Sequence, residues 1–117
     1  MLVSGTFNVL HPGHIYFLKK AKKLGGKNAQ LIVVLTHRAN TDKVVYPDDD
    51  RKMLISAVKF VDKVILGDKK DKSKVIKKEK PDIIVLGYDQ KMPCNFNGKI
   101  YKIKKYKNYS SGFKRVR

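Results

Sequence analysis

The stretch Gly5–His14, with the sequence GTFNVLHPGH, contains the features that decide the fold of this chain. It follows a short apolar run, Met1–Ser4, which predicts a first strand that breaks at the glycine. Apolar residues then recur at helical spacing over residues 15–24, and Pro12 stands where the first turn of a helix tolerates proline. The stretch is therefore predicted to be a strand-to-helix turn that carries two histidines.

The rest of the chain repeats this alternation of strands and helices. Strands are predicted at Leu31–Leu35, Lys63–Leu66, Asp82–Leu86 and Ile100–Ile103, and helices from Pro47 through Val61, at Lys72–Lys80 and from Ser110 onward. Such alternation predicts an α/β fold, a doubly wound parallel sheet of about five strands with helices on both faces. At 117 residues the chain is predicted to be a single domain, 1–117. Ligands of such sheets bind at the carboxyl ends of strands, here after the first and fourth.

Two connections are short for this architecture. Only Lys91–Gly98 joins the fourth strand to the fifth, and the stretch Thr41–Tyr46 is also brief. A parallel crossover needs about ten or more residues, usually a helix. The fifth strand is therefore predicted to be antiparallel or displaced, unless segments at both places are missing or disordered, which is the alternative we favour.

Composition limits the classes of function. The chain has 27 basic and 10 acidic residues, a net charge of +17, which favours anionic partners such as nucleic acid, phosphorylated metabolites or a membrane surface. The apolar runs are too short to span a bilayer, and no signal peptide precedes the first strand. A single cysteine, Cys94, excludes an internal disulfide framework and a cysteine-rich zinc site. A cytoplasmic setting without membrane partners is expected.

The two histidines of the turn carry the first chemical hypothesis. Backbone N–H groups at a helix start attract phosphate, and the imidazoles of His11 and His14 can add donors to the same anion. Such a site stabilises charge that builds up on a phosphoryl group. The alternative is structural, with one histidine capping the helix and the other packing against it.

The turn resembles the GTFDxxHxGH signature of the cytidylyltransferase-like nucleotidyltransferases, a Rossmann-like superfamily related to the HIGH-motif synthetases. Three further stretches, Pro47–Arg51, Pro81–Asp89 and Tyr109–Ser111, resemble motifs of that family in the expected order. The resemblance thus covers nearly the whole chain. It matches the signature at Gly5, Thr6, Phe7, His11, Gly13 and His14.

The resemblance implies that a phosphate of the acceptor attacks the α-phosphorus of a nucleoside triphosphate, with Mg²⁺ assisting and pyrophosphate leaving. It implies catalytic roles at the triphosphate for His11, His14, Lys43 and Arg51. Magnesium is then held mainly by the triphosphate, with no metal ligand assigned to the protein. The nucleotide-binding residues that the resemblance implies are Thr6, Phe7, Asn8, His11, Gly13, His14, Gly87, Asp89, Tyr109, Ser110 and Ser111.

Several of these residues have a structural alternative. Arg51 could pair with Asp48 on its own helix, Asp89 could be an ordinary turn carboxylate, and Lys43 is one lysine among many. His37 and Cys94 are predicted to be structural or surface residues. Two positions depart from the family pattern: Asn8 stands where the family has Asp, and Lys105 stands where an arginine is frequent.

Within the family, the sequence Gly87-Tyr88-Asp89-Gln90 and the terminal serines most resemble the archaeal-type FAD synthases. This resemblance implies transfer of AMP from ATP to flavin mononucleotide (FMN). The alternatives are cytidylyl transfer from CTP to glycerol 3-phosphate or a related acceptor, and adenylyl transfer to a sugar phosphate or phosphopantetheine. A non-catalytic nucleic-acid binder is a remote alternative, because it would not need the histidine signature. Small transferases of this kind commonly form homodimers, and a homodimer is expected here.

Overall fold

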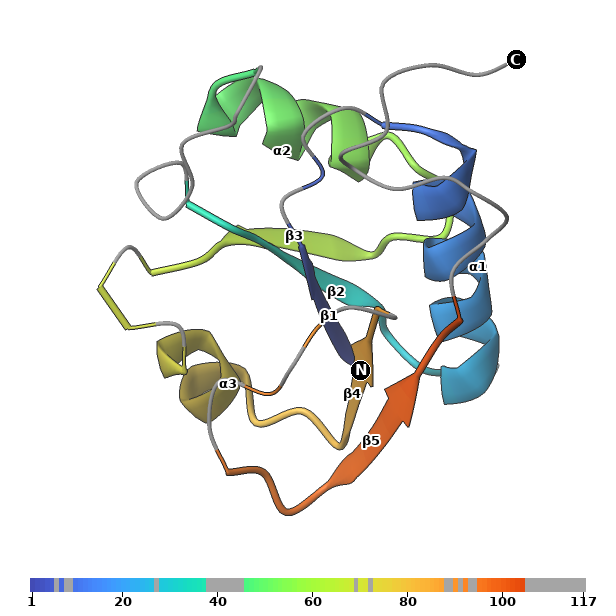
Figure 1. Ribbon diagram of the computed structural model, residues 1–117, viewed down its shortest axis with the longest axis vertical. Helices are drawn as coiled ribbons and strands as arrows, with labels where there is room; N and C mark the ends of the chain where they lie inside the picture. Colours follow the sequence, from blue (N-terminus) through green and yellow to red (C-terminus); the bar gives the residue numbers. More distant parts are fainter. Residues whose placement is uncertain are drawn as a thin grey trace.

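The structure is a computed structural model that describes residues 1–5, 7, 10–26, 28–37, 46–68, 70, 71, 73–87, 90, 92 and 95–104. Figure 1 shows helices packed on both faces of a central sheet. The elements in chain order are β1 (Leu2–Gly5), α1 (Pro12–Gly25), β2 (Ile32–Leu35), α2 (Asp48–Ser56), β3 (Lys63–Leu66), α3 (Lys74–Glu79), β4 (Ile83–Leu86) and β5 (Lys99–Lys102). The predicted strands lie within one residue of the observed ones at each end.

All five strands form one parallel sheet in the order β3-β2-β1-β4-β5. The central strand β1 pairs with β2 on one side and with β4 on the other, so that Leu2 lies between Ile32 and Ile84. The chain moves outward from β1 to β3 and then returns to β4. The strand order therefore reverses between β1 and β4, where doubly wound sheets bind ligands. This confirms the predicted fold class.

The core lies on both faces of the sheet, because successive residues of a strand point to opposite sides. On one face, Val3, Val33 and Val85 pack against Leu18 of α1 and Ile55 of α2. The opposite face is covered by the shorter helix α3, in a smaller cluster of Leu2, Val34, Val75, Ile84 and Leu86. The prediction of helices on both faces is confirmed.

Helix α2 ends earlier than predicted. It spans Asp48–Ser56, whereas the apolar spacing predicted a helix through Val61. The chain instead continues in tight turns, in which the N–H of Val58 donates to the Ile55 carbonyl and the N–H of Val61 to the Val58 carbonyl. Both valines still pack against the core. The apolar residues of this stretch are therefore packed by turns, which lead the chain into β3, and not by a longer helix.

The fifth strand is parallel to β4, with Ile83 paired to Lys99, so the prediction of an antiparallel or displaced strand is wrong. The connection over residues 87–98 has no helix in its described part, and its Met92 and Phe96 pack against the α3-face cluster. A side chain at Gly98 would place its Cβ 2.5 Å from the Asp82 carbonyl oxygen, so only glycine allows this entry into the strand. The favoured alternative, that residues are missing or disordered here and at Thr41–Tyr46, falls largely outside the described residues and stays a prediction.

A charged cluster fixes the chain at the amino end of the sheet. The carboxylate of Asp62 accepts hydrogen bonds from the backbone N–H of Leu31, at 2.7 Å, and from the ammonium of Lys22. Lys22 also donates to the Ala29 carbonyl at 2.8 Å. The Leu31 N–H and then Lys22 lower the pKa of Asp62. This cluster ties the end of α1 to the starts of β2 and β3.

The helix predicted from Ser110 onward lies outside the described residues. None of the helices in the described part of the chain is long and apolar enough to cross a membrane.

Candidate active site

The two histidines of the predicted turn form the N-terminal cap of α1. His11 is the N-cap residue, and its Nδ1 accepts a hydrogen bond from the N–H of Gly13 at 3.0 Å. His14 reaches back, and its Nδ1 accepts from the N–H of His11 at 3.2 Å. Ser or Thr with Glu commonly fill these two positions of a capping box. Here both positions are filled by imidazoles, so the structural alternative that one histidine caps the helix is also met.

The capping box determines which nitrogen carries the proton. A nitrogen that accepts a backbone N–H cannot itself be protonated, so both Nδ1 atoms are unprotonated in this arrangement. The neutral tautomer of each ring therefore carries its proton on Nε2. The Nδ1 atom thus fixes the orientation of each ring, and the Nε2 atom is its hydrogen-bond donor.

Burial keeps His14 neutral. It lowers the pKa of His14 from 6.5 to about 4, with a smaller contribution from the neighbouring His11. The two rings stack with centroids 3.8 Å apart and an interplanar angle of 19°. Two imidazolium ions would repel each other at this separation. His14 is therefore a neutral donor at neutral pH.

The backbone N–H groups of the first helical turn are already used inside the turn. The N–H of Gly13 donates to His11 Nδ1, and those of His14 and Ile15 donate to the His11 carbonyl at 2.9 and 3.4 Å. The sequence had predicted that such groups would attract phosphate. In the structure the Nε2 atom of His11 is also buried.

Phe7 packs beside His14. It is 5% exposed, and its ring centroid lies 5.1 Å from that of His14. Its φ of 46° is unusual for a residue other than glycine and marks a strained turn of the kind found at functional sites. A Cβ on Gly5 would lie 2.8 Å from Phe7 Cε2, so glycine allows the ring to lie against the strand. The buried ring packs beside His14, and the role of Phe7 in nucleotide binding stays a prediction.

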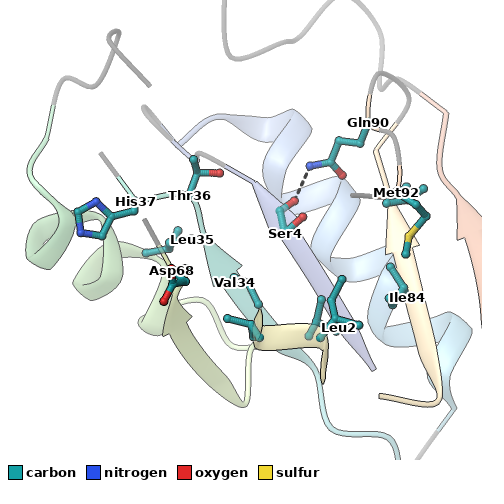
Figure 2. Close-up of a pocket in the computed structure, with 14 residues that line it drawn as sticks. Leu2, Ser4, Val34, Leu35, Thr36, His37, Asp68, Ile84, Gln90 and Met92 are labelled. Atoms are coloured by element: carbon teal, nitrogen blue, oxygen red, sulfur yellow. Dashed lines mark hydrogen bonds between the residues drawn. The ribbon is translucent and has the colours of Figure 1, made fainter. Parts of the chain in front are cut away.

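The turn after β4 is tied to the end of β1 by Gln90. Its Nε2 donates to the Ser4 carbonyl at 2.7 Å, and its Oε1 accepts from the N–H of Gly87 at 2.7 Å. Figure 2 shows this side chain reaching toward Ser4 across the point where the strand order reverses. Gly87, a predicted nucleotide-binding residue, thus has its N–H engaged by Gln90. Sequence analysis assigned no role to Gln90, although its position after the fourth strand was a usable signal.

Arg51 is placed differently from the sequence prediction. Its side chain is fully buried, with 0% exposure, and it donates to the Thr36 carbonyl at 2.9 Å and the Tyr46 carbonyl at 3.2 Å. It also pairs with the carboxylate of Asp48, the structural alternative that the sequence left open. The guanidinium thus joins the end of β2 to the start of α2. In this position it acts as a positioning residue, and its catalytic role at the triphosphate stays a prediction.

His37, at the end of β2, belongs to the same network. Its Nε2 lies 3.6 Å from Asp48 Oδ2, so Asp48 lies between His37 and Arg51. This agrees with the prediction of a structural or surface role for His37. Seven predicted site residues lie outside the described residues: Thr6, Asn8, Lys43, Asp89, Tyr109, Ser110 and Ser111.

The structure brings together two stacked imidazole rings at the carboxyl end of β1, beside the point where the strand order reverses, and burial keeps that of His14 neutral. Neutral donors in a partly buried site can stabilise charge on phosphoryl oxygens without first losing the hydration of a cation. Among the described residues, no group of three or more His, Cys, Asp or Glu side chains could hold a metal ion. The arrangement suits binding of a phosphorylated ligand.

Comparison with known proteins agrees with this geometry. Residues 2–111 match the family model "Cytidylyltransferase-like". The FAD synthase of Archaeoglobus fulgidus is 47% identical over 92 residues, which cover 76% of this chain and 65% of that protein. The FAD synthase of Methanothermus fervidus is 40% identical over 120 residues, covering 91% of this chain and 83% of that protein.

The match to some of these proteins is partial in length. The chain covers 58% of the FAD synthase of Archaeoglobus profundus, which is 48% identical over 93 residues. It thus spans about three fifths of the curated relatives that it matches first. Among solved structures, the lipopolysaccharide core biosynthesis protein from Thermoplasma volcanium superposes with a TM-score of 0.78 at 38% identity, covering 91% of this chain and 96% of that one. The resemblance seen in the sequence is confirmed over the sheet and the histidine turn alike, and the chain belongs to the cytidylyltransferase-like family.

Proposed function

We propose that this protein is an adenylyltransferase that transfers AMP from ATP to FMN, giving FAD and pyrophosphate. The observation that carries the proposal is the imidazole capping box of His11 and His14, which holds two stacked imidazole rings at the carboxyl end of β1. FAD synthases that are 40–48% identical over most of this chain support FMN as the acceptor. The net charge of +17 favours two anionic substrates.

In the proposed reaction, a phosphate oxygen of FMN attacks the α-phosphorus of ATP. A new P–O bond forms as the bond between the α-phosphorus and the bridging oxygen breaks, and pyrophosphate leaves with that electron pair. The attacking phosphate is already ionised at neutral pH, so no general base is required. The Nε2–H groups of His11 and His14 would donate to phosphate oxygens as charge shifts toward the leaving group.

Magnesium is the expected cofactor, and it neutralises charge on the triphosphate when bound. We propose that the ion is held mainly by the triphosphate, since Mg²⁺ is usually bound through substrate phosphates. The roles proposed for Thr6, Asn8, Lys43, Asp89 and the terminal Tyr109–Ser111 rest on the family motif alone. Asn8 in place of Asp removes a charge near the expected phosphate position.

Cytidylyl transfer to glycerol 3-phosphate is the second candidate. It is favoured by the name of the family model, which matches residues 2–111. The described histidine turn suits either nucleotide, since it would contact phosphates and not the base.

The test is a pyrophosphate-release assay in which ATP and CTP are each combined with FMN, glycerol 3-phosphate and phosphopantetheine. Release with ATP and FMN only, accompanied by FAD on chromatography, is the expected result. Release with CTP and glycerol 3-phosphate would establish the second candidate. Nucleotide binding without release in any combination would contradict both proposals and point to another acceptor.

A further inference from the structure

A pocket of about 210 Å³ lies on the α3 face of the sheet, away from the α1 and α2 core. Figure 2 shows it between the strands and the segment after β4, with Gln90 and Met92 on one side and Asp68 on the other. It is open at the carboxyl ends of the strands, where Ser4, Thr36 and Gly67 border it. The pocket and the histidine turn therefore share the same end of β1.

The floor of the pocket is aliphatic. Three neighbouring strands and α3 contribute its side chains, which are Leu2, Val34, Val75, Ile76, Ile84 and Leu86. Most of them form the α3-face cluster, and Met92 and Phe96 pack against it. A surface of this kind binds an apolar or aromatic group and gains little from contact with a phosphate.

The charge of the pocket differs from that of the chain. Of the described residues that line it, none is a lysine or arginine, although the chain has 27 of them. The rim carries a carboxylate, Asp68, whose pKa is lowered by hydrogen bonds from the backbone N–H groups of Asp71 and Lys70. The ammonium Nζ of Lys74 lies 3.4 Å from Asp68 Oδ2, so the two charges at this rim form an ion pair. The pocket therefore suits an uncharged part of a ligand.

The polar groups of the rim are held in fixed directions. The amide of Gln90 is fixed at both ends, by Ser4 and by Gly87. His37 is held by Asp48 on α2. An aliphatic floor with a few oriented polar groups at its mouth is typical of sites for small planar molecules. Its volume suits part of a substrate and not a whole dinucleotide.

We propose that this pocket binds the isoalloxazine ring of the flavin acceptor, an inference that rests on the proposed function. The ring is flat and uncharged, with an apolar dimethylbenzene edge for the aliphatic floor and a polar pyrimidine edge for the rim. With the ring in the pocket, the phosphate chain leaves past Ser4 and Gly5 toward His11 and His14 on the other side of β1. Adenine fits less well, because polar nitrogens surround most of its edge.

The test separates ring binding from phosphate binding by using riboflavin, which lacks the phosphate. Its affinity for the intact protein is measured by flavin fluorescence anisotropy, and ATP affinity is measured in parallel by calorimetry. Ile76→Trp fills the pocket and Met92→Lys introduces a cation into it. The matched controls are Leu54→Trp and Met53→Lys, since both side chains lie exposed on α2, away from the pocket.

We expect each pocket variant to weaken riboflavin binding at least tenfold and to raise KM for FMN, while the Kd of ATP changes less than twofold. The controls are expected to change neither affinity more than twofold. Unchanged ATP binding also demonstrates that a variant has folded. If Ile76→Trp disrupts α3, the pocket assignment is tested with Met92→Lys and with the milder change Ile76→Ala.

The outcomes separate this inference from the proposed function. FAD formation with unchanged riboflavin affinity and KM for FMN in all pocket variants would overturn the pocket assignment alone. Competition by adenosine in place of riboflavin would make this a base pocket and overturn it too. Binding of ATP without any binding of riboflavin or FMN by the unmodified protein would overturn both proposals. Loss of riboflavin binding in the pocket variants only would establish the site.

Discussion

Two polar clusters lie at opposite ends of the same sheet, and their electrostatics are opposite. At the amino end, the Leu31 N–H and the Lys22 ammonium lower the pKa of Asp62 and favour its charged form. At the carboxyl end, burial and the neighbouring His11 lower the pKa of His14 to about 4 and favour its neutral form. One cluster is a charged pair and the other a pair of neutral rings.

The difference indicates that the Asp62 cluster has a structural role, whereas the histidine pair belongs to the candidate active site. The ions around Asp62 satisfy each other and hold the chain, and they offer little to a ligand. The imidazoles use their Nδ1 atoms for the backbone and keep Nε2–H in a fixed direction, so the fold positions the donors before a substrate arrives. The predicted catalytic group His14 thus differs from the charged groups of the Asp62 cluster in being neutral.

The largest loss of stability is expected on replacing Arg51, which lies at the carboxyl end of the sheet but has a structural role. Replacing it in Arg51→Met leaves Asp48 and the carbonyls of Thr36 and Tyr46 without their donor. Breaking a buried ion pair in this way costs about 3–5 kcal/mol of unfolding free energy. Urea unfolding measures it. Arg51→Lys is expected to recover part of the loss, since one ammonium cannot serve all three acceptors.

A result that contradicts this assignment is equally clear. If Arg51→Met left the urea midpoint unchanged and raised KM for ATP tenfold or more, Arg51 would contact phosphate as its motif implies. The two ends of the sheet would then differ more sharply than the structure indicates.

The second effect compares the two clusters directly. His14→Ala removes an oxyanion donor and is expected to lower kcat about 10²–10³-fold in the pyrophosphate-release assay. Asp62→Asn is the matched change at the amino end, and it is expected to lower the urea midpoint while leaving kcat within twofold. Equal losses of kcat in both variants would mean that His14 acts only through stability.

The sequence predicted most of the fold because strands and helices carry different periods. Leu31–Leu35 and Lys63–Leu66 are apolar, β-branched runs bounded by polar residues, and they form β2 and β3 within one residue. The end of α2 could not be predicted, since the spacing of Val58 and Val61 fits both a helix and successive tight turns. The direction of β5 was missed because a crossover helix was expected, whereas the described part of residues 87–98 has none and its partly buried Met92 and Phe96 pack against the α3-face cluster.

The candidate site was predicted in position but not in detail. The motif located His11 and His14, yet it could not indicate that their Nδ1 atoms cap the helix and leave Nε2 as the donor. The burial of Arg51 depends on the Thr36 carbonyl, fifteen residues earlier in the chain, and only tertiary structure brings the two together. Gln90 was missed for the same reason, since its partner is Ser4 on the first strand.

The third effect is the pH dependence of stability, and the two clusters act in different pH ranges. The pKa of His14 is about 4 in the folded protein and 6.5 in the unfolded chain, so the unfolded state takes up this proton first as pH falls. The stability contributed by neutral His14 is present above pH 6.5 and is lost toward pH 4, by about 2 kcal/mol after allowance for its partial exposure.

Urea unfolding of the unmodified protein and of His14→Gln between pH 7 and pH 4 measures this slope. The variant is expected to lose most of it, whereas Asp62→Asn is expected to keep it. The contribution of Asp62 is lost only at lower pH, as its carboxylate becomes protonated below the ordinary value of 3.8. A slope that persists in His14→Gln would mean that other groups control it.

The smallest effect comes from adding one methyl group at each end of the sheet. In Gly5→Ala the new Cβ would lie 2.8 Å from Phe7 Cε2, and in Gly25→Ala it would lie 2.6 Å from the terminal methyl of Met1. Both changes overpack the protein and are expected to cost about 1–2 kcal/mol in urea unfolding. Only Gly5→Ala displaces the ring that supports His14, so only this variant is expected to lower kcat/KM, by about tenfold. If Gly25→Ala lowered kcat/KM as much, the strain of packing would reach the histidines from either end, and the two clusters would not be independent.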